Sequence, residues 1–262
     1  MPFVNDRLVR ANLIGDQSQK RNWVLPNEVP IGFIYNKLEH AVMMATPADL
    51  QDFALGFSLA EGVLHRPEEF LGVRVCELEH GIELHITIAD NRLQKLKMHR
   101  QRRAHRGRAG CGICGIDNLA DALRPLPKLP ADSFELERAV ILQAISSLPD
   151  NQPMRANNHT VHGAAWVSKS GEILIVREDI GRHNALDKMI GARGSSGNSG
   201  FALLSSRCTY ELVQKCAMAN IGTLVCLSAP TISAVETAVK ANIRLCVFER
   251  KAKEVLQFNS PV

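Results

Sequence analysis

The sequence is poor in several features that mark common classes of protein. Only 5% of its 262 residues are aromatic, too few for a large stacking surface for single-stranded nucleic acid. No apolar run approaches the roughly 18 residues of a membrane span, and residues 1–16 lack the apolar core of a signal peptide. The absence of a Gly-x-x-x-x-Gly-Lys-Ser/Thr motif argues against a Walker-type NTPase. We therefore expect a cytoplasmic globular protein that binds neither membrane nor nucleic acid.

Acidic residues are missing from one long stretch of the chain. From Arg92 to Arg108 the sequence contains eight Lys and Arg residues and no Asp or Glu, although the formal net charge of the whole chain is only +4. This uneven distribution favours a local site for an anion over a surface that coats nucleic acid. A solvated helix face is the simpler interpretation of the same run.

The cysteines do not form a disulfide framework. Seven is an odd number for a chain of this length, and five of them lie in apolar or helical patterns typical of buried small side chains. The other two, Cys111 and Cys114, stand in a glycine-rich segment, Gly110–Gly115, directly after the basic run. Nearby cations favour the reactive thiolate, and glycine permits tight turns that leave sulfur accessible. The five cysteines expected to be buried are Cys76, Cys208, Cys216, Cys226 and Cys246.

Three kinds of chemistry compete for the Cys111 and Cys114 pair. A four-ligand zinc site needs two more ligands, and the chain has no second Cys-x-x-Cys; His159 and His162 would point to opposite faces of a strand. A thioredoxin-like redox motif belongs in a βαβ setting, whereas this pair follows a basic helix. A persulfide carrier, in which one thiolate accepts a sulfane sulfur and passes it on, suits the basic neighbourhood. We expect no structural metal.

The first half of the chain, residues 1–125, predicts an α+β domain that ends in the basic helix and the Cys-Gly-Ile-Cys-Gly segment. An irregular or edge-strand entry over about the first 20 residues is followed by hairpins at 28–45 and 72–89. Between them, Thr46 and Pro47 predict a helix start, with Thr46 as the N-cap. Residues 91–105 have the composition of a helix. A stretch with three prolines, Arg124–Pro130, then forms a stiff connector.

The second half, residues 126–262, predicts an α/β domain. Helices are expected near 136–148, 183–190, 210–220 and 232–242, and a hairpin is expected over 162–178. Short apolar strands at 201–205, 223–227 and 244–248 alternate with these helices, the last of them closing the domain. Such alternation indicates a parallel sheet covered by helices on both faces, which is a three-layer α/β/α arrangement.

Polar residues follow four successive strands of this predicted sheet. In open α/β sheets, ligands bind beyond the carboxyl ends of the strands. Hydroxyls, arginines and helix N-termini gathered there predict a cradle for a phosphate-bearing ligand that is bound and not hydrolysed. The simpler role of such Ser and Thr residues is helix capping, and Arg182 has Asp179 and Asp187 as alternative partners. The four segments are Glu178–Asn184, Ser205–Arg207, Ser228–Thr231 and Glu249–Lys251.

Five motifs spread over about residues 28 to 250 point to a known family. They are Val42-Met43-Met44-Ala45, Phe53-Ala54-Leu55-Gly56-Phe57-Ser58-Leu59, Cys111-Gly112-Ile113-Cys114-Gly115, Glu178-Asp179-Ile180-Gly181-Arg182-His183-Asn184-Ala185-Leu186-Asp187-Lys188 and Ser205-Ser206-Arg207. These motifs resemble the FdhD/NarQ family, the sulfurtransferases that serve formate dehydrogenase maturation.

The resemblance implies a function and a fold. It implies that Cys111 takes sulfur from a cysteine desulfurase as a persulfide, with Cys114 assisting, and delivers it to the molybdenum (or tungsten) bis-guanine-dinucleotide cofactor of formate dehydrogenase. It also implies a homodimer and a cytidine-deaminase-like α/β/α domain preceded by an α+β domain. GDP would mimic half of the cofactor. The residues expected to hold the cofactor are Arg182, His183, Ser206, Arg207, Cys246, Val247, Phe248, Glu249, Arg250 and Lys251.

The chain departs from the family pattern at the exit of the last strand. Family members usually read Phe-Cys-Lys-Pro-Gly-Arg there, whereas this chain reads Phe248-Glu249-Arg250-Lys251-Ala252-Lys253 and keeps only the Phe and the basic character. In addition, His162-Gly163-Ala164 lacks the glutamate of the deaminase signature, so deaminase chemistry is not implied. The alternative to a sulfurtransferase is a non-catalytic chaperone for the cofactor or for the apo-enzyme.

Overall fold

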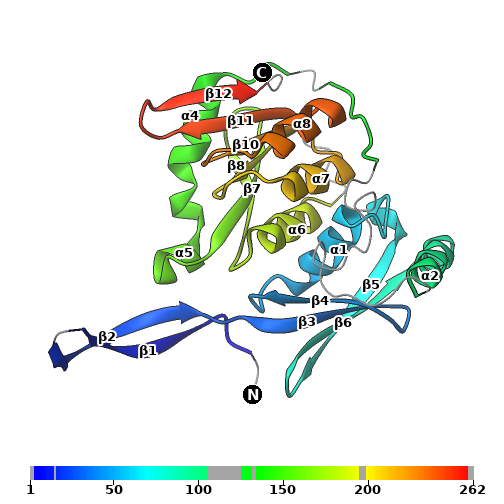
Figure 1. Ribbon diagram of the computed structural model, residues 1–262, viewed down its shortest axis with the longest axis horizontal. Helices are drawn as coiled ribbons and strands as arrows, with labels where there is room; N and C mark the ends of the chain where they lie inside the picture. The colour runs from blue at the N-terminus through cyan, green and yellow to red at the C-terminus, as the bar shows by residue number, and fades with distance from the viewer. Residues whose placement is uncertain (1–2, 15, 105–124, 132–133, 195–198, 259–262) are drawn as a thin grey trace.

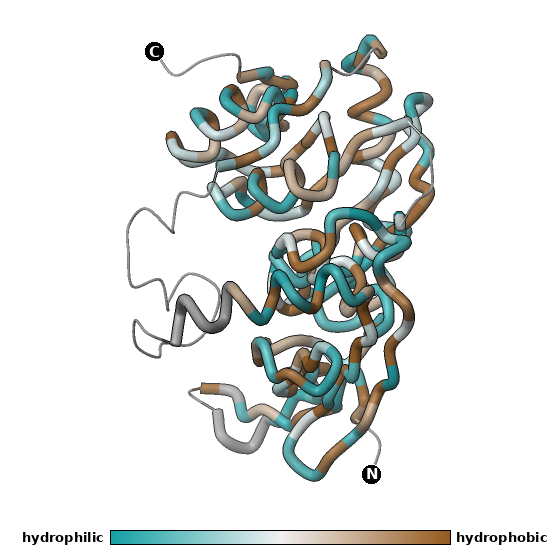
Figure 2. The backbone as a smooth tube through the Cα atoms, turned by 90° about the vertical axis from the view of Figure 1, so that its right-hand side faces the viewer, coloured by the Kyte–Doolittle hydropathy of each residue, from teal (hydrophilic) through white to brown (hydrophobic). Residues whose placement is uncertain are grey.

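The computed structural model describes residues 3–14, 16–104, 125–131, 134–194 and 199–258, and it contains three separate β-sheets. In Figures 1 and 2 the two termini lie at opposite ends of the molecule, and hydrophobic and hydrophilic residues alternate along most elements. Among the described residues, no helix is both long and apolar enough to cross a membrane.

The first sheet is a two-stranded arm, where the sequence predicted only an irregular or edge-strand entry. Strands β1 (Asp6–Leu13) and β2 (Asp16–Pro26) pair antiparallel and extend away from the rest of the molecule (Figure 1). Val9 lies opposite Trp23, and both side chains are exposed. The prediction failed because this hairpin lacks the one-sided apolar alternation by which half-buried strands are recognised.

The second sheet has four strands in the order β4-β3-β6-β5 and is covered on one face by helix α1 (Leu50–Ala60). Phe33 and Tyr35 point into the core, where Phe33 stacks on Phe57 with the ring centroids 4.1 Å apart. Both predicted hairpins are confirmed. The strands are β3 (Val29–Tyr35), β4 (Leu38–Ala45), β5 (Phe70–Leu78) and β6 (Gly81–Ile88).

Helix α1 begins three residues later than the Thr46 cap predicts. The residue before the helix is Asp49, which adopts a left-handed conformation with φ 53° and gives no side-chain cap. Thr46 is fully buried, and its backbone N–H donates to Asp179 Oδ2 at 3.0 Å. Its hydroxyl accepts from the N–H of Ile180 at 3.2 Å. Thr46 therefore connects the two halves of the chain, and a long-range contact displaces the local capping that its position favours.

The third sheet has six strands in the order β12-β11-β10-β9-β7-β8, and its helices lie on both faces. Helix α4 (Arg138–Ser147) packs against one face through Ile141 and Ala144, and α6, α7 and α8 cover the other (Figure 1). The three-layer α/β/α prediction is confirmed. The elements are α6 (Arg182–Arg193), α7 (Tyr210–Met218), α8 (Ile232–Ala241), β7 (His162–Ser168), β8 (Ile173–Asp179), β9 (Gly200–Leu204), β10 (Thr223–Cys226), β11 (Arg244–Glu249) and β12 (Glu254–Phe258).

This sheet is mixed, whereas the strand and helix alternation predicted a parallel one. Strands β8 and β9 are both antiparallel to β7, and β9, β10 and β11 are parallel to one another. Strand β12 pairs antiparallel with β11, so the prediction that the strand at 244–248 is the last is wrong. Residues 254–258 include the apolar Val255, Leu256 and Phe258, a short strand pattern that the prediction overlooked.

A helix predicted over residues 91–105 is present as α2 (Asp90–Ala104), but the first arginine of the basic run, Arg92, is not part of a solvated surface. Arg92 is buried, and its guanidinium donates to the carbonyl oxygens of Val63 at 2.7 Å and Gly62 at 2.8 Å. The carboxylate of Glu69 lies 3.6 Å away. Arg92 therefore anchors α2 to the segment after α1, whereas Lys95 and Lys97, further along the helix, are exposed.

The two halves of the chain meet where α1 crosses α6 at two glycines. A Cβ atom at Gly56 would overlap the carbonyl oxygen of Asp187, and one at Gly191 would overlap the carbonyl oxygen of Asp52. Beside this crossing, the buried Lys215 donates to Glu61 and to Asp187, each at 2.9 Å. Burial raises the pKa of Asp187 to about 6. A single apolar core extends from the second sheet through this contact into the third.

The close crossing makes Gly56 intolerant of any side chain. We expect Gly56→Ala to destabilise the protein by about 2 kcal/mol or more, because the two helix backbones must separate. In urea unfolding, Gly32→Ala on the open face of β3 should cost much less, since its Cβ would meet no atom closer than 3.8 Å. Equal stability of the two variants would contradict the close-packed crossing.

Candidate functional site

The segments that the sequence singled out do gather at one edge of the third sheet. Strands β8 to β11 all end at this edge, and β7 begins there with His162 opposite Asp179. The loop after β9 is tied to β7, because Ser205 N–H donates to the carbonyl of Gly163 and Gly163 N–H donates to Ser205 Oγ. His162 therefore lies between the segment after β8 and the segment after β9.

Five basic side chains form a cluster at this edge. They come from four different elements, and His162 lies close enough to the other four for their charges to act on it. Burial, and then these positive charges, lower the pKa of His162. Concentrated positive charge without a matching set of carboxylates is what an anion site requires. The basic cluster consists of Arg155, His162, Arg182, His183 and Arg207.

The start of α6 is fixed by a buried carboxylate. Asp179 accepts hydrogen bonds from Gly181 N–H at 2.8 Å and from Asn184 Nδ2 at 3.0 Å. Its other oxygen pairs with Lys188 Nζ at 2.7 Å, and both Asp179 and Lys188 are fully buried. This network sets the turn that presents Arg182 and His183. Several residues of the Glu178–Lys188 motif therefore have a structural role, and two of them, Arg182 and His183, belong to the basic cluster.

Neither of the partners considered for Arg182 pairs with it. Asp179 is taken by Lys188, and Asp187 is taken by Lys215 at 2.9 Å. Arg182 Nε is shielded from solvent and has no hydrogen-bond partner among the described residues. His183 pairs with Glu211 on α7 at 2.6 Å, and this hydrogen bond lowers the pKa of Glu211. Arg182 therefore keeps a shielded donor that is available to a ligand.

A second buried carboxylate places Arg155. Glu178 accepts from the backbone N–H groups of Met154 at 2.8 Å and Arg155 at 2.9 Å, at the start of α5 (Pro153–Asn158). Burial raises the pKa of Glu178, although these hydrogen bonds act in the opposite direction. Sequence reasoning missed Arg155 and considered His162 only as a metal ligand. Nothing local in the sequence links Arg155 to Glu178, which lies 23 residues further along the chain.

Other hydroxyls at this edge have structural roles. Ser206 is buried, and its hydroxyl donates to the carbonyl of Arg207 at 3.0 Å. Thr231 caps α8 by accepting from Ala234 N–H at 3.2 Å. The simpler capping role weighed for the strand-end hydroxyls therefore applies at Thr231.

The exit of β11 divides into buried and exposed parts. Cys246 and Val247 are buried on opposite faces of the sheet, while Arg250 and Lys251 are exposed in the turn to β12. Phe248 and Glu249 are half-buried, and the Glu249 carboxylate accepts from Lys251 N–H at 3.1 Å. Four strand spacings of about 4.8 Å separate β11 from β8, so the two ends of the edge lie roughly 19 Å apart. Only an extended ligand would reach both.

The cysteine pair that organised the sequence prediction, Cys111 and Cys114, lies outside the described residues. Of the other five cysteines, four are buried, as predicted, and Cys76 is half-buried. Burial raises the pKa of Cys246 to about 11 and raises that of Cys216 further. A thiol held in that way is a poor nucleophile at neutral pH. Among the described residues, no group of three or more His, Cys, Asp or Glu side chains could hold a metal ion.

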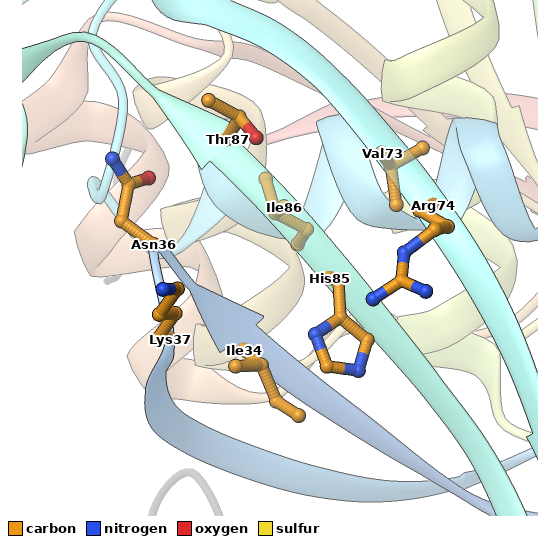
Figure 3. A pocket seen from close by; sticks show the side chains of 8 residues that line it. All are labelled: Ile34, Asn36, Lys37, Val73, Arg74, His85, Ile86 and Thr87. Atoms are coloured by element: carbon orange, nitrogen blue, oxygen red, sulfur yellow. The ribbon is translucent and has the colours of Figure 1, made fainter.

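A cavity near the surface lies elsewhere, on the outer side of the second sheet. It has a volume of about 500 Å³, and Arg74 and His85 project into it side by side from β5 and β6 (Figure 3). Lys37 lines its rim from the β3–β4 turn. His85 is paired with Glu83 at 2.8 Å. This cavity belongs to a different sheet from the basic cluster and shares no residue with it.

The buried pair of Asp179 and Lys188 gives a test of how the site is held. We expect Lys188→Met to destabilise the protein by about 3 kcal/mol or more, because it leaves the Asp179 carboxylate buried without its cation. Urea unfolding would measure the loss, and the double variant Asp179→Asn with Lys188→Met should recover part of it. A single variant as stable as the unmodified protein would show that the network does not fix this turn.

Comparisons with known proteins agree with this architecture. The model of the FdhD/NarQ family matches residues 26–259. The chain is 39% identical to the Sulfur carrier protein FdhD of Bordetella petrii, over 93% of this chain and 87% of that protein. It is 43% identical to the protein of the same name from Cupriavidus necator, over 87% and 80%. A crystal structure of a chain assigned as a formate dehydrogenase accessory protein from Desulfotalea psychrophila, 21% identical, shares the fold with a TM-score of 0.73 over 99% and 98%. The chain therefore belongs to the FdhD/NarQ family.

Proposed function

We propose that this protein is a cytoplasmic sulfur carrier that accepts sulfane sulfur on Cys111 and passes it to an anionic cofactor bound at the strand-end edge. The observation that carries the proposal is the match, at about 40% identity and over most of the chain, to proteins named sulfur carrier. The basic cluster supports the proposal, since a sulfur carrier needs a binding site for the acceptor of the sulfur. The donor in this proposal is a cysteine desulfurase.

The first step is a transfer between two sulfurs. The Cys111 thiolate attacks the outer sulfur of the persulfide on the donor. A new sulfur–sulfur bond forms on Cys111 as the old one breaks, and the donor cysteine leaves as a thiolate. The positive charge that precedes Cys111 in the sequence favours its thiolate at neutral pH.

The second step releases the sulfur in reduced form. The Cys114 thiolate attacks the inner sulfur of the persulfide, so that a Cys111–Cys114 disulfide forms and hydrosulfide leaves. The two cysteines are oxidised by the two electrons that the sulfane sulfur gains. The hydrosulfide then becomes a ligand of the metal in the acceptor, which we take to be the molybdenum or tungsten bis-guanine-dinucleotide cofactor of formate dehydrogenase.

The basic cluster fits the phosphates of such an acceptor. Arg182 has an unused, shielded donor, and Arg207 is exposed at the same edge. Arg250 and Lys251 follow β11, which lies four strand spacings, or roughly 19 Å, from β8, and this separation suits a ligand with two nucleotide arms. Cys246 and Val247 are buried as side chains, so a contact from them would have to use their backbone. His183, Ser206, Phe248 and Glu249 complete the proposed binding set.

The alternative is a chaperone that binds the cofactor or the formate dehydrogenase apo-enzyme without handling sulfur. It requires the same basic cluster but no reactive thiol. We propose a homodimer in either case. The two functions differ in cells, because a Cys111→Ser variant that fully matures formate dehydrogenase would favour the chaperone.

Persulfide formation tests the carrier directly. Incubation with a cysteine desulfurase and cysteine should add one sulfur atom to the protein, and mass spectrometry of its peptides should locate that atom on Cys111. Cys111→Ala should lose the addition. Cys76→Ala removes a half-buried cysteine of the second sheet and should retain it. A Cys111→Ala protein that still gains sulfur at the same level would sink the carrier mechanism.

A further inference from the structure

Two side chains of the basic cluster, Arg155 and His162, have no individual role in the function proposed above. Both lie at the edge where the acceptor would bind. Arg155 is exposed on α5, and His162 is half-buried at the start of β7. Their position beside Arg182 and Arg207 raises the question of what they recognise.

The carboxylates near the cluster are committed to other partners. Glu178 accepts from two backbone N–H groups at the start of α5, and Asp179 pairs with Lys188. Glu211 on α7 pairs with His183 at 2.6 Å, and its carboxylate also lies within reach of the Arg182 charge. No ion pair joins Arg155, Arg182 or Arg207 to a carboxylate within the ranges that the structure describes. The negative charge of Glu178 still acts on Arg155, and that of Glu211 acts on Arg182, but neither carboxylate forms an ion pair with these guanidinium groups.

His162 is held where a bound anion would change its charge. Burial disfavours its imidazolium form, and the positive charges of Arg182, Arg155, Arg207 and His183 disfavour it further, so its pKa is lowered. The imidazole is therefore neutral near pH 7 in the unliganded protein. A doubly negative phosphate placed among these groups reverses the sign of the local field and raises the pKa of His162.

We propose that Arg155 and His162, together with Arg182 and Arg207, bind the diphosphate of a nucleotide ligand, and that His162 takes up a proton as the diphosphate binds. The inference rests on the proposed function in taking the ligand to be a guanine nucleotide diphosphate. It goes beyond it by assigning two further binding residues and by coupling binding to protonation. Glu178 acts as a positioning residue, because its two hydrogen bonds set the backbone from which Arg155 projects.

Calorimetric titration near pH 7 in two buffers that differ in ionisation enthalpy measures both affinity and proton uptake. The probes are GDP and inorganic pyrophosphate. The unmodified protein should take up a fraction of a proton, up to about one, for each GDP bound. His162→Gln should bind more weakly and abolish that uptake. Because pyrophosphate lacks the base and the ribose, equal proton uptake with pyrophosphate would assign the coupling to the diphosphate.

Arginine variants locate the contact. Arg155→Ala should raise the dissociation constant for GDP about tenfold, which is the effect of losing one charge-assisted hydrogen bond. The matched control is Lys240→Ala, which removes one exposed positive charge from the last turn of α8 and should leave the dissociation constant unchanged. Binding that weakens equally in both variants would reflect net charge alone and would overturn the assignment of Arg155.

A double-mutant cycle tests the positioning role of Glu178. The Gln side chain of Glu178→Gln can accept only one of the two backbone N–H bonds. The substitution should therefore weaken GDP binding in the otherwise unmodified protein and have no further effect on GDP binding in the Arg155→Ala variant. Additive losses would mean that Glu178 does not act through Arg155. Thermal unfolding of each variant shows whether the fold is kept, and a folded Glu178→Asp gives a second, milder displacement of α5 if Glu178→Gln is unstable.

The failures of the two proposals are distinguishable. If GDP and pyrophosphate both fail to bind while Cys111 still gains sulfur, the diphosphate site is wrong and the sulfur carrier stands. If GDP binds with proton uptake that depends on His162 while Cys111 gains no sulfur, the carrier is wrong and the site stands. Binding that is unchanged in both Arg155→Ala and His162→Gln overturns the inference.

Discussion

The hydrogen bonds and the ion pair of the buried Asp179 carboxylate are the interactions on which the rest of the molecule depends. The carboxylate accepts from Thr46 of the first half and from Gly181 and Asn184 of the second, and it pairs with Lys188. A buried charge is tolerated only when its partners are complete, so each of these donors constrains where the others lie. The consequence is that the loop before α1 and the start of α6 cannot move independently. The site inherits its geometry from a contact between two parts of the chain more than 130 residues apart.

The glycine crossing of α1 and α6 reinforces the same constraint. Because Gly56 and Gly191 let the helix backbones touch, the second and third sheets share one core and their relative orientation is fixed. A wider separation would expose Lys215 and the two carboxylates that hold it. Close backbone packing and buried ion pairs therefore depend on each other here. Removing either the close packing or the ion pairs should therefore lower the free energy of unfolding by more than the contacts removed directly.

The helices and strands could be predicted from the sequence better than the long-range contacts that join them. Hairpins, most helices and the polar strand ends followed from periodicity and turn residues, because these are local properties. The late start of α1 could not be predicted, since Thr46 looks like an N-cap until Asp179 is brought to it from far along the chain. Arg155 escaped notice for the same reason, because its position is set by Glu178. The direction of β7 also depends on pairing that no local pattern encodes. Residues whose role is decided by a distant carboxylate were those that local reasoning missed.

The charged groups at the strand-end edge and the protonation of the buried cysteines both indicate that ligand binding and sulfur chemistry involve different residues. At the edge, Glu178, Asp179 and Glu211 are used within the protein, and the arginines remain for a ligand. In the core, burial keeps thiols such as Cys246 protonated and unreactive at neutral pH. The proposed acceptor site therefore has no nucleophile of its own among the buried cysteines of the described residues. The proposed function assigns the sulfur chemistry to Cys111 instead. We therefore propose that ligand binding and sulfur chemistry lie on separate segments of the chain, with the basic cluster as the place where the two meet.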